Sequence, residues 1–230
     1  MSSEPRLERR LVAELLGTFL FVFVGAGSAI ATQSLFSNPG SSLLIGALAN
    51  GLGLAVAVSI TMGISGGALN PAVTIALFLG KKMKGKDVVP YIIAQLIGAT
   101  LAGAVLVASV PNSLGSGANW GAPSLSSAIT VGQGLLLELV MTFFLVMAVY
   151  GTAVDKRAPK IAGFGIGLAV LTDVLAGGPF TGAAMNPARA MGPMFASLTF
   201  PSYWWIYWIG PIVGGGLAGL IYNRVLEKEN

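Results

Sequence analysis

Two short stretches decide the fold of this chain of 230 residues: Asn70–Leu79, which reads NPAVTIALFL, and Asn186–Phe195, which reads NPARAMGPMF. Each is about ten residues long, so as a helix each extends over about 15 Å, half of a hydrocarbon core of about 30 Å. Both begin with Asn, which caps helix N-termini well, followed by Pro, which the first helical turn tolerates. We therefore predict two short helices with matching starts, each half as long as a membrane span.

The composition around these stretches indicates a membrane protein. Only 10% of the residues are charged and 54% are hydrophobic, with a mean hydropathy of +0.80, whereas a soluble domain carries about 25% charged residues. The charges are also clustered, because none lies within 15–80, 88–137 or 190–223. Such long uncharged runs cannot cover a soluble surface, so the chain crosses the membrane several times.

Several functional classes are excluded by the residue types that are missing. The chain has no His and no Cys, which excludes disulfides, thiol nucleophiles and the usual zinc and haem ligands. A Ser-His-Asp or Cys-His enzyme lacks its base. The net charge of +4 comes from residues that flank apolar segments and form no basic face, so we expect no nucleic acid partner. No cofactor is implied.

Six segments are long and apolar enough to span a bilayer, which takes about 20 residues. They lie at about 11–32, 43–62, 88–110, 131–152, 161–177 and 203–223, and the stretches 37–41 and 111–123 are turn-like. All but one of the 13 basic residues fall on one side of these spans, Lys160 and Lys228 among them. Basic loops stay inside, so we expect a cell membrane protein with both termini cytoplasmic. The exception is Arg189, on an outside connection.

The two halves of the chain match each other. The motif Glu-x-x-x-Thr-Phe opens both the first span, from Glu14, and the fourth, from Glu138, and Gly98 in the third span corresponds to Gly210 in the sixth. Each half holds three spans and one half-helix, and because three is odd, the second half is inverted. We predict an all-α membrane fold of six transmembrane helices plus two re-entrant half-helices. The expected single domain, 1–230, consists of inverted repeats at about 8–110 and 131–224 joined by an outside loop, 111–130.

The paired motifs Asn70-Pro71-Ala72 and Asn186-Pro187-Ala188, with Arg189 after the second, resemble the major intrinsic protein family of aquaporins and glycerol facilitators, and the chain is closer to the aquaporin side. The resemblance covers about residues 8–224. It implies an aquaporin-like fold and a passive water channel that excludes ions and protons, without enzymatic activity. It also implies a homotetramer in the lipid bilayer, with one pore in each protomer.

The expected site follows from these motifs. Each half-helix presents roughly half a positive charge at its N-terminus, and two such termini at the midplane raise the energy of a cation there. The amides of Asn70 and Asn186 would donate hydrogen bonds to passing water, unless both serve only as N-caps. Glu14 and Glu138 are expected to hold the re-entrant loops through backbone N–H groups, and a proton relay is the alternative.

The resemblance also places an outer constriction at Asn50, Val174, Ala183 and Arg189. Typical water channels of the family carry an aromatic residue and a His at the first two positions, so Asn50 and Val174 depart from that pattern and widen the expected ring. Glycerol facilitators carry large aromatic residues at the first and third positions. Water passage is therefore the main expectation, and a facilitator of small neutral solutes such as glycerol, urea or ammonia is the alternative.

Two other classes compete with a channel. An ion-coupled transporter also uses inverted repeats and broken helices, but it needs polar coupling groups at the midplane, and the chain offers only Glu14, Glu138 and Asp173. An intramembrane enzyme needs a nucleophile and a base at membrane depth, which the missing His makes very hard to supply. No role is assigned to Asp173.

Overall fold

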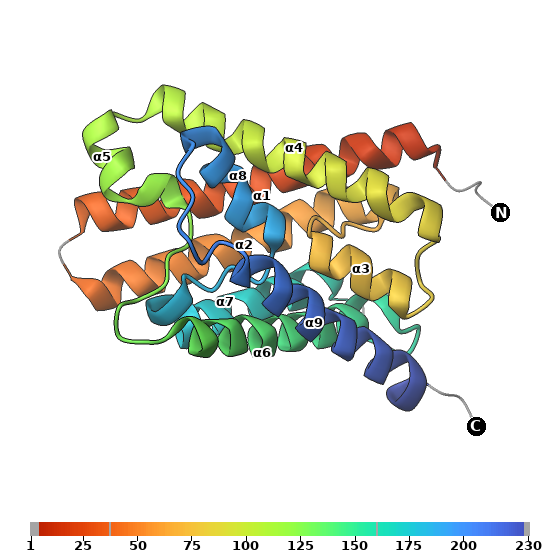
Figure 1. Ribbon diagram of the computed structural model, residues 1–230. Coiled ribbons are helices and arrows are strands. Elements are labelled where there is room, and N and C mark those ends of the chain that lie inside the picture. Colours follow the sequence, from red (N-terminus) through yellow and green to blue (C-terminus); the bar gives the residue numbers. More distant parts are fainter. Residues whose placement is uncertain (1–4, 37, 160, 228–230) are drawn as a thin grey trace.

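The computed structural model describes residues 5–36, 38–159 and 161–227. It confirms the predicted helical membrane fold, because six of the described helical segments are long and apolar enough to cross a bilayer (Figure 1). They are α1 (Leu7–Leu35), α2 (Pro39–Ser65), α4 (Gly85–Ser109), α6 (Val131–Val149) continued by η2 (Tyr150–Val154), α7 (Ala162–Thr181), and α9 (Ile206–Ile221) continued by η3 (Tyr222–Leu226). Lys160 and Lys228, predicted on the basic side, lie outside the described residues.

The two half-helices are α3 (Pro71–Leu79) and α8 (Pro187–Ser197). In Figure 1, α3 lies in one half of the bundle's length and α8 in the other. Each packs against the last long helix of the opposite half of the chain, α3 against α9 and α8 against α4. This exchange ties the two halves of the sequence into one body.

The long helices pack in corresponding pairs. Helix α1 contacts α2 and α4, α6 contacts α7 and α9, and α2 contacts α7 across the two halves. Gly98 on α4 lies against the backbone of Leu15, and Gly214 on α9 lies against the backbone of Leu139, so a side chain at either position would overlap the neighbouring helix. Gly98 therefore corresponds to Gly214. The expected match with Gly210 is wrong by one helical turn.

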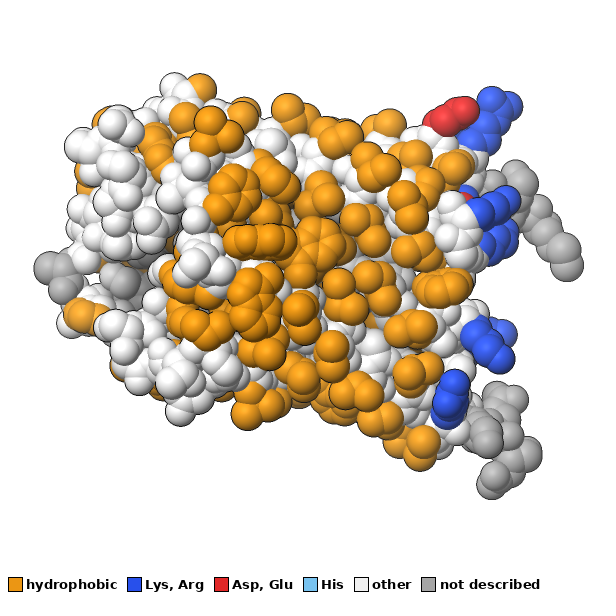
Figure 2. Space-filling view, in the orientation of Figure 1, with side chains coloured by type: hydrophobic (Ala, Val, Ile, Leu, Met, Phe, Trp, Pro, Cys, Tyr) orange, Lys and Arg blue, Asp and Glu red, His pale blue; other side chains and the backbone are white. Residues whose placement is uncertain are grey.

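The surface shows a broad apolar band with different ends (Figure 2). Lys and Arg side chains gather at one end, where α1 begins and α9 ends. The opposite end, in this view, is formed by uncharged groups and backbone. This separation agrees with the charge pattern of the sequence.

Two stretches predicted as turns are partly helical. The stretch 111–123 contains α5 (Asn112–Gly117) and the short helix η1 (Asn119–Gly121). In the stretch 37–41, Ser37 lies outside the described residues, while Asn38 caps α2, accepting a hydrogen bond from the Ser41 N–H at 3.1 Å. Proline at the first helical position explains why a turn-like sequence starts a helix here.

Candidate functional site

The starts of the two half-helices are built alike. The Oδ1 atom of Asn70 accepts a hydrogen bond from the Ala72 N–H at 2.8 Å. The Oδ1 atom of Asn186 accepts from the N–H groups of Ala188 at 2.9 Å and Arg189 at 3.2 Å. Proline follows each Asn, where its missing N–H leaves no gap in the helical ladder. Both side chains are thus N-caps with oriented amide groups.

The same two amides connect the half-helices to each other. The Nδ2 group of Asn70 donates to the Met185 carbonyl at 2.9 Å, and that of Asn186 donates to the Leu69 carbonyl at 2.9 Å. Each accepting residue directly precedes the opposite Asn. An amide nitrogen carries two hydrogens, and within the described residues each Nδ2 makes only this one bond. One N–H of each Asn is therefore available to a ligand.

Both Asn residues line a narrow cavity with a water-accessible volume of about 20 Å³. One part of its wall comes from the half-helices and the segments before them, and it holds the polar side chains of the lining, Asn70 and Asn186. The second part comes from α1, α2, α6 and α7 and is lined by apolar side chains. The residues of the first part are Gly67, Ala68, Asn70, Val73, Ala184 and Asn186, and those of the second part are Phe21, Leu54, Val58, Leu145, Val149, Ile166 and Val170.

Two fully buried carboxylates hold the segments that lead into the half-helices. Glu14 accepts hydrogen bonds from the N–H groups of Ala68 at 3.0 Å and Leu69 at 2.7 Å. Glu138 accepts from the N–H groups of Ala184 at 2.9 Å and Met185 at 2.7 Å. Every acceptor oxygen thus has a backbone donor from the loop that the sequence analysis assigned to it.

These loops carry left-handed backbone at equivalent places. Leu69 has a φ of 49° and Met185 a φ of 51°, and Ala183 has a φ of 45°. Such conformations cost about 1–3 kcal/mol for residues other than glycine, and they persist only where the surroundings fix them. The N–H groups of Leu69 and Met185 are those bound by Glu14 and Glu138 at the shortest distances, 2.7 Å. The carboxylates therefore fix the strained backbone that determines the positions of Asn70 and Asn186.

Sequence reasoning missed a second pair of supports. Ser65 and Thr181 donate their hydroxyl groups to Glu14 at 2.6 Å and to Glu138 at 2.7 Å. Their own carbonyls accept from the hydroxyl groups of Tyr91 and Tyr207, each at 2.9 Å. Ser65 and Thr181 are separated in the chain by the same number of residues as Asn70 and Asn186, and so are Tyr91 and Tyr207. A search at this fixed spacing would have found them.

Arg189 lies one turn beyond Asn186 and is buried, with 6% of its surface exposed. Its Nη1 group donates to the Gly121 carbonyl at 2.8 Å, and its Nε group approaches Asn50 Oδ1 at 3.5 Å. Asn50 in turn donates through Nδ2 to the Gly46 carbonyl at 2.9 Å. The structure thus brings together two of the four residues of the expected constriction.

The outside loop supplies the carbonyl that binds Arg189, which the sequence analysis did not anticipate. Gly121 ends η1, directly after the buried Trp120, whose ring packs against Gly115. A side chain on Gly121 would overlap the backbone of Ala26 on α1. The aromatic residue and the glycines in an otherwise small and polar loop were the available signal. The loop therefore folds inward and fixes the guanidinium group.

The other two residues of the expected constriction lie close to the cavity wall. Val174 is buried on α7, one turn beyond the cavity-lining Val170. Ala183 is buried next to the cavity-lining Ala184. Asp173 is also buried, and its Oδ2 atom has no partner among the described residues. Within that part of the chain Arg189 makes no ion pair with Asp173, and no group of His, Cys, Asp or Glu could hold a metal ion.

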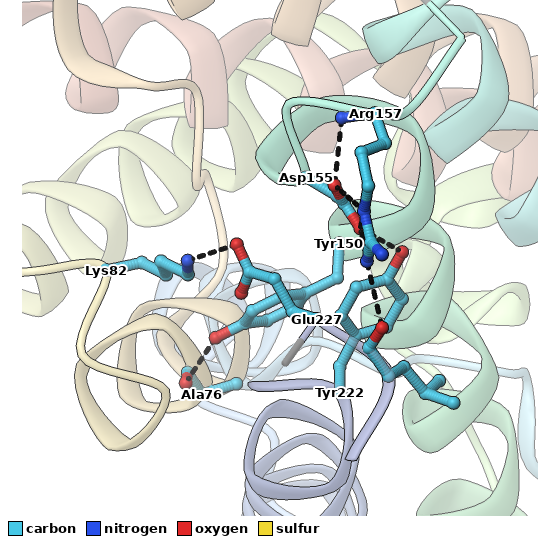
Figure 3. A network of polar contacts seen from close by, with 8 residues as sticks. Ala76, Lys82, Tyr150, Asp155, Arg157, Tyr222 and Glu227 are labelled. Atoms are coloured by element: carbon cyan, nitrogen blue, oxygen red, sulfur yellow. Dashed lines mark hydrogen bonds and ion pairs between the residues drawn. The ribbon is translucent and has the colours of Figure 1, made fainter. Parts of the chain in front are cut away.

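A polar network joins three segments at the basic end of the molecule (Figure 3). The Asp155 carboxylate accepts from the guanidinium of Arg157 at 2.6 Å and from the Tyr222 hydroxyl at 3.2 Å. Arg157 also donates to the Leu226 carbonyl at 2.8 Å, and Lys82 forms an ion pair with Glu227 at 2.5 Å. The network fastens the end of α9 and η3 to the connections that follow α3 and η2.

Asp155→Asn should lower the melting temperature of the detergent-solubilised protein by a few degrees at neutral pH. The hydrogen bonds from Arg157 hold the pKa of Asp155 well below its ordinary value. The ionised carboxylate therefore stabilises the fold fully at any pH above that ordinary value. This contribution is lost only as the pH falls through the lowered pKa. Thermal unfolding at pH 7 and pH 5 should therefore show the same difference between variant and parent, and a difference that vanishes at pH 5 would contradict this assignment.

The sequence matches proteins of a known family over nearly its whole length. The model of the major intrinsic protein family matches residues 1–222. A probable aquaporin of TIP type from Medicago truncatula is 44% identical over 229 residues, which cover 96% of this chain and 88% of that protein. Aquaporin TIP2-1 from Arabidopsis thaliana is 44% identical over 227 residues, which cover 94% of this chain and 87% of that protein.

A solved structure is similar over the same extent. The X-ray structure of the aquaglyceroporin from Plasmodium falciparum superposes with a TM-score of 0.87 at 26% sequence identity. The match covers 96% of this chain and 97% of that one. The similarity therefore extends over nearly the whole chain.

Proposed function

The chain belongs to the major intrinsic protein family, and from this premise we propose that it is a passive water channel that excludes ions and protons. The observation that carries the proposal is the cavity lined by Asn70 and Asn186, each with one N–H group free within the described residues. The names of its relatives, which are called aquaporins, support the same function. No step of this function involves enzymatic chemistry.

Exclusion of cations follows from the two half-helices. Their N-termini lie close together, since each Asn donates to the residue before the other. Each terminus carries roughly half a positive charge, and Arg189 adds a full charge toward the outer side. A cation entering the cavity would lose its hydration shell and meet only positive potential. A water molecule has no net charge and passes.

Water passage follows from the division of the cavity wall. A water molecule beside the two Asn residues accepts hydrogen bonds from their amides, so its own hydrogens point away along the pore in both directions. This orientation interrupts the chain of hydrogen bonds through which protons move. The apolar residues opposite offer no hydrogen bonds and hold water only weakly. We assign Glu14 and Glu138 the role of fixing the loops that set this arrangement.

Osmotic shrinkage of proteoliposomes tests the proposal. Vesicles containing the purified protein should shrink much faster than bare vesicles when an impermeant osmolyte is added, and the rate should have the weak temperature dependence of a pore. Shrinkage at the rate of bare vesicles would overturn the proposal. Re-swelling under glycerol and urea gradients in the same apparatus measures the solute range.

Facilitation of small neutral solutes is the second candidate, and the composition of the outer constriction favours it. Asn50, Val174 and Ala183 are small or medium side chains, so the ring around Arg189 lacks bulky aromatic residues. Gly25 on α1 adds room, because a side chain there would overlap Asn50 Oδ1. Fast urea or glycerol entry beside fast water flux would identify the protein as a solute facilitator.

Asn50→Phe combined with Val174→His should lower urea and glycerol permeability at least several-fold and leave most water permeability intact. The two larger side chains fill the ring that Arg189 borders, and water is the smaller permeant. Re-swelling and shrinkage of the same vesicles give the ratio of solute permeability to water permeability. A ratio equal to that of the parent would remove Asn50 and Val174 from the constriction.

We further propose the setting in which the channel works. The basic end is cytoplasmic, as the charge bias predicts, so both termini face the cytoplasm of the cell membrane. The chain forms one domain of two inverted repeats, supported by the matching contacts of its two halves. Resemblance to the family supports a homotetramer in the lipid bilayer. Protease access to the termini in sealed vesicles and the mass of the detergent-solubilised complex test these points.

A further inference from the structure

The two half-helices are not held in the same way. Asn186 caps α8 with two backbone N–H donors on its Oδ1 atom, whereas Asn70 caps α3 with one. The first half-helix has instead a chain of side-chain hydrogen bonds that the second lacks. The members of this chain are Glu14, Gln95 and Thr74, all fully buried.

Gln95 is the centre of the chain. Its Nε2 group donates to Glu14 Oε2 at 2.7 Å and to Thr74 Oγ1 at 2.9 Å, which uses both hydrogens of the amide. The Thr74 hydroxyl in turn donates a hydrogen bond to the Asn70 carbonyl at 2.9 Å. The backbone of the pore-lining Asn70 is thereby tied, through two side chains, to the carboxylate that holds its loop.

Two further observations single out this arrangement. The Oε1 atom of Gln95 is buried and has no partner among the described residues, so the amide is placed for its donors and not for its acceptor. At the spacing that relates the two halves, Pro211 takes the place of Gln95 and Ala190 that of Thr74. Neither residue has a side-chain donor, so the second half-helix cannot form the same chain.

We infer that Gln95 is a positioning residue of the pore, which through Thr74 fixes Asn70 and keeps its amide on the Met185 carbonyl. This inference rests on the proposed water channel. Gln95 itself lies outside the cavity lining and touches no permeant. Without its two hydrogen bonds, Asn70 moves away from its partner and the orienting donor of the first half-helix leaves the pore axis. Water still passes, but protons are no longer excluded.

The test compares osmotic water permeability and proton permeability in the same proteoliposomes. Gln95→Met keeps the length of the side chain and removes both donors. The net contribution of one hydrogen bond corresponds to up to about a tenfold change in an equilibrium constant. We therefore expect proton permeability to rise about tenfold, with water permeability changed by about twofold or less. Gln33→Met is the matched control, because Gln33 is exposed and donates only to the Gly117 carbonyl at the outer end. The control should behave as the parent.

A pair of variants at Thr74 keeps the inference falsifiable if Gln95→Met does not fold. Thr74→Val removes the hydroxyl at nearly constant shape and should raise the proton permeability. Thr74→Ser keeps the hydroxyl and should leave the proton permeability at the parent value. The double variant of Gln95→Met and Thr74→Val should leak no more than the stronger single variant. A merely structural role would lower both fluxes together. Parent-like proton exclusion in Thr74→Val and Gln95→Met would overturn the inference, whereas absent water flux in the parent would refute the water channel itself.

Discussion

Glu138→Leu is expected to abolish water permeation. Leucine removes the acceptor of three buried donors, the Thr181 hydroxyl and the N–H groups of Ala184 and Met185. Each donor left without a partner costs about 1–3 kcal/mol, and the left-handed backbone at Met185 loses the group that fixes it. The segment before Asn186 should then collapse into the cavity. Osmotic shrinkage of proteoliposomes with equal amounts of folded protein measures the loss.

Two controls separate this effect from general damage. Glu8→Leu makes the same change at an exposed position in the first turn of α1 and should leave water permeability unchanged. Glu138→Gln keeps one oxygen for Thr181 and Ala184 but presents an N–H group to Met185, so it should retain part of the flux. Full water flux in Glu138→Leu would show that the carboxylate does not hold the loop.

Asn186→Asp is expected to turn the water channel into one that leaks cations. Asp caps helix N-termini as well as Asn, so α8 should still form. The change removes the hydrogen bond to the Leu69 carbonyl and places a negative charge between the two half-helix termini. Because each terminus contributes roughly half a positive charge, one carboxylate offsets both. Proton and sodium permeability should rise at least tenfold, measured with an internal pH dye and by sodium-driven potentials.

The matched control for this prediction is Asn38→Asp. Asn38 is exposed and also caps a helix, accepting from the Ser41 N–H at 3.1 Å. It lies outside the cavity lining, so its replacement should leave ion exclusion intact. Cation exclusion that survives in Asn186→Asp would mean that the barrier resides elsewhere, with Arg189 as the remaining positive group of the pore.

The architecture was accessible from the sequence because the membrane imposes simple rules. The lengths of the apolar runs predicted six spans, and two copies of Asn-Pro-Ala predicted two half-helices, all of which the structure confirms. The boundaries were less accurate. The last span begins at Ile206 and not at Tyr203, because an aromatic run reads as apolar even where the chain turns.

The site was only partly accessible, and the missing parts share a physical cause. Tyr91 and Tyr207 each donate one hydrogen bond to a backbone carbonyl of another segment, and Gln95 donates two to side chains of two other helices. The residues next to them in the sequence do not indicate these partners. The Gly121 carbonyl that binds Arg189 is a backbone group, so the aromatic residue and the glycines of its loop indicate a folded loop but not which carbonyl binds Arg189. Such contacts appear only when the fold brings the segments together.

Simultaneous measurement of water and proton flux through the parent protein tests the central claim most directly. Proteoliposomes loaded with a pH-sensitive dye are exposed to an osmotic step and, separately, to a pH step. We predict osmotic water flux far above that of bare vesicles, together with proton flux no greater than theirs. Water flux at the bare-vesicle rate, or proton flux that rises with the amount of protein, would contradict the proposed channel.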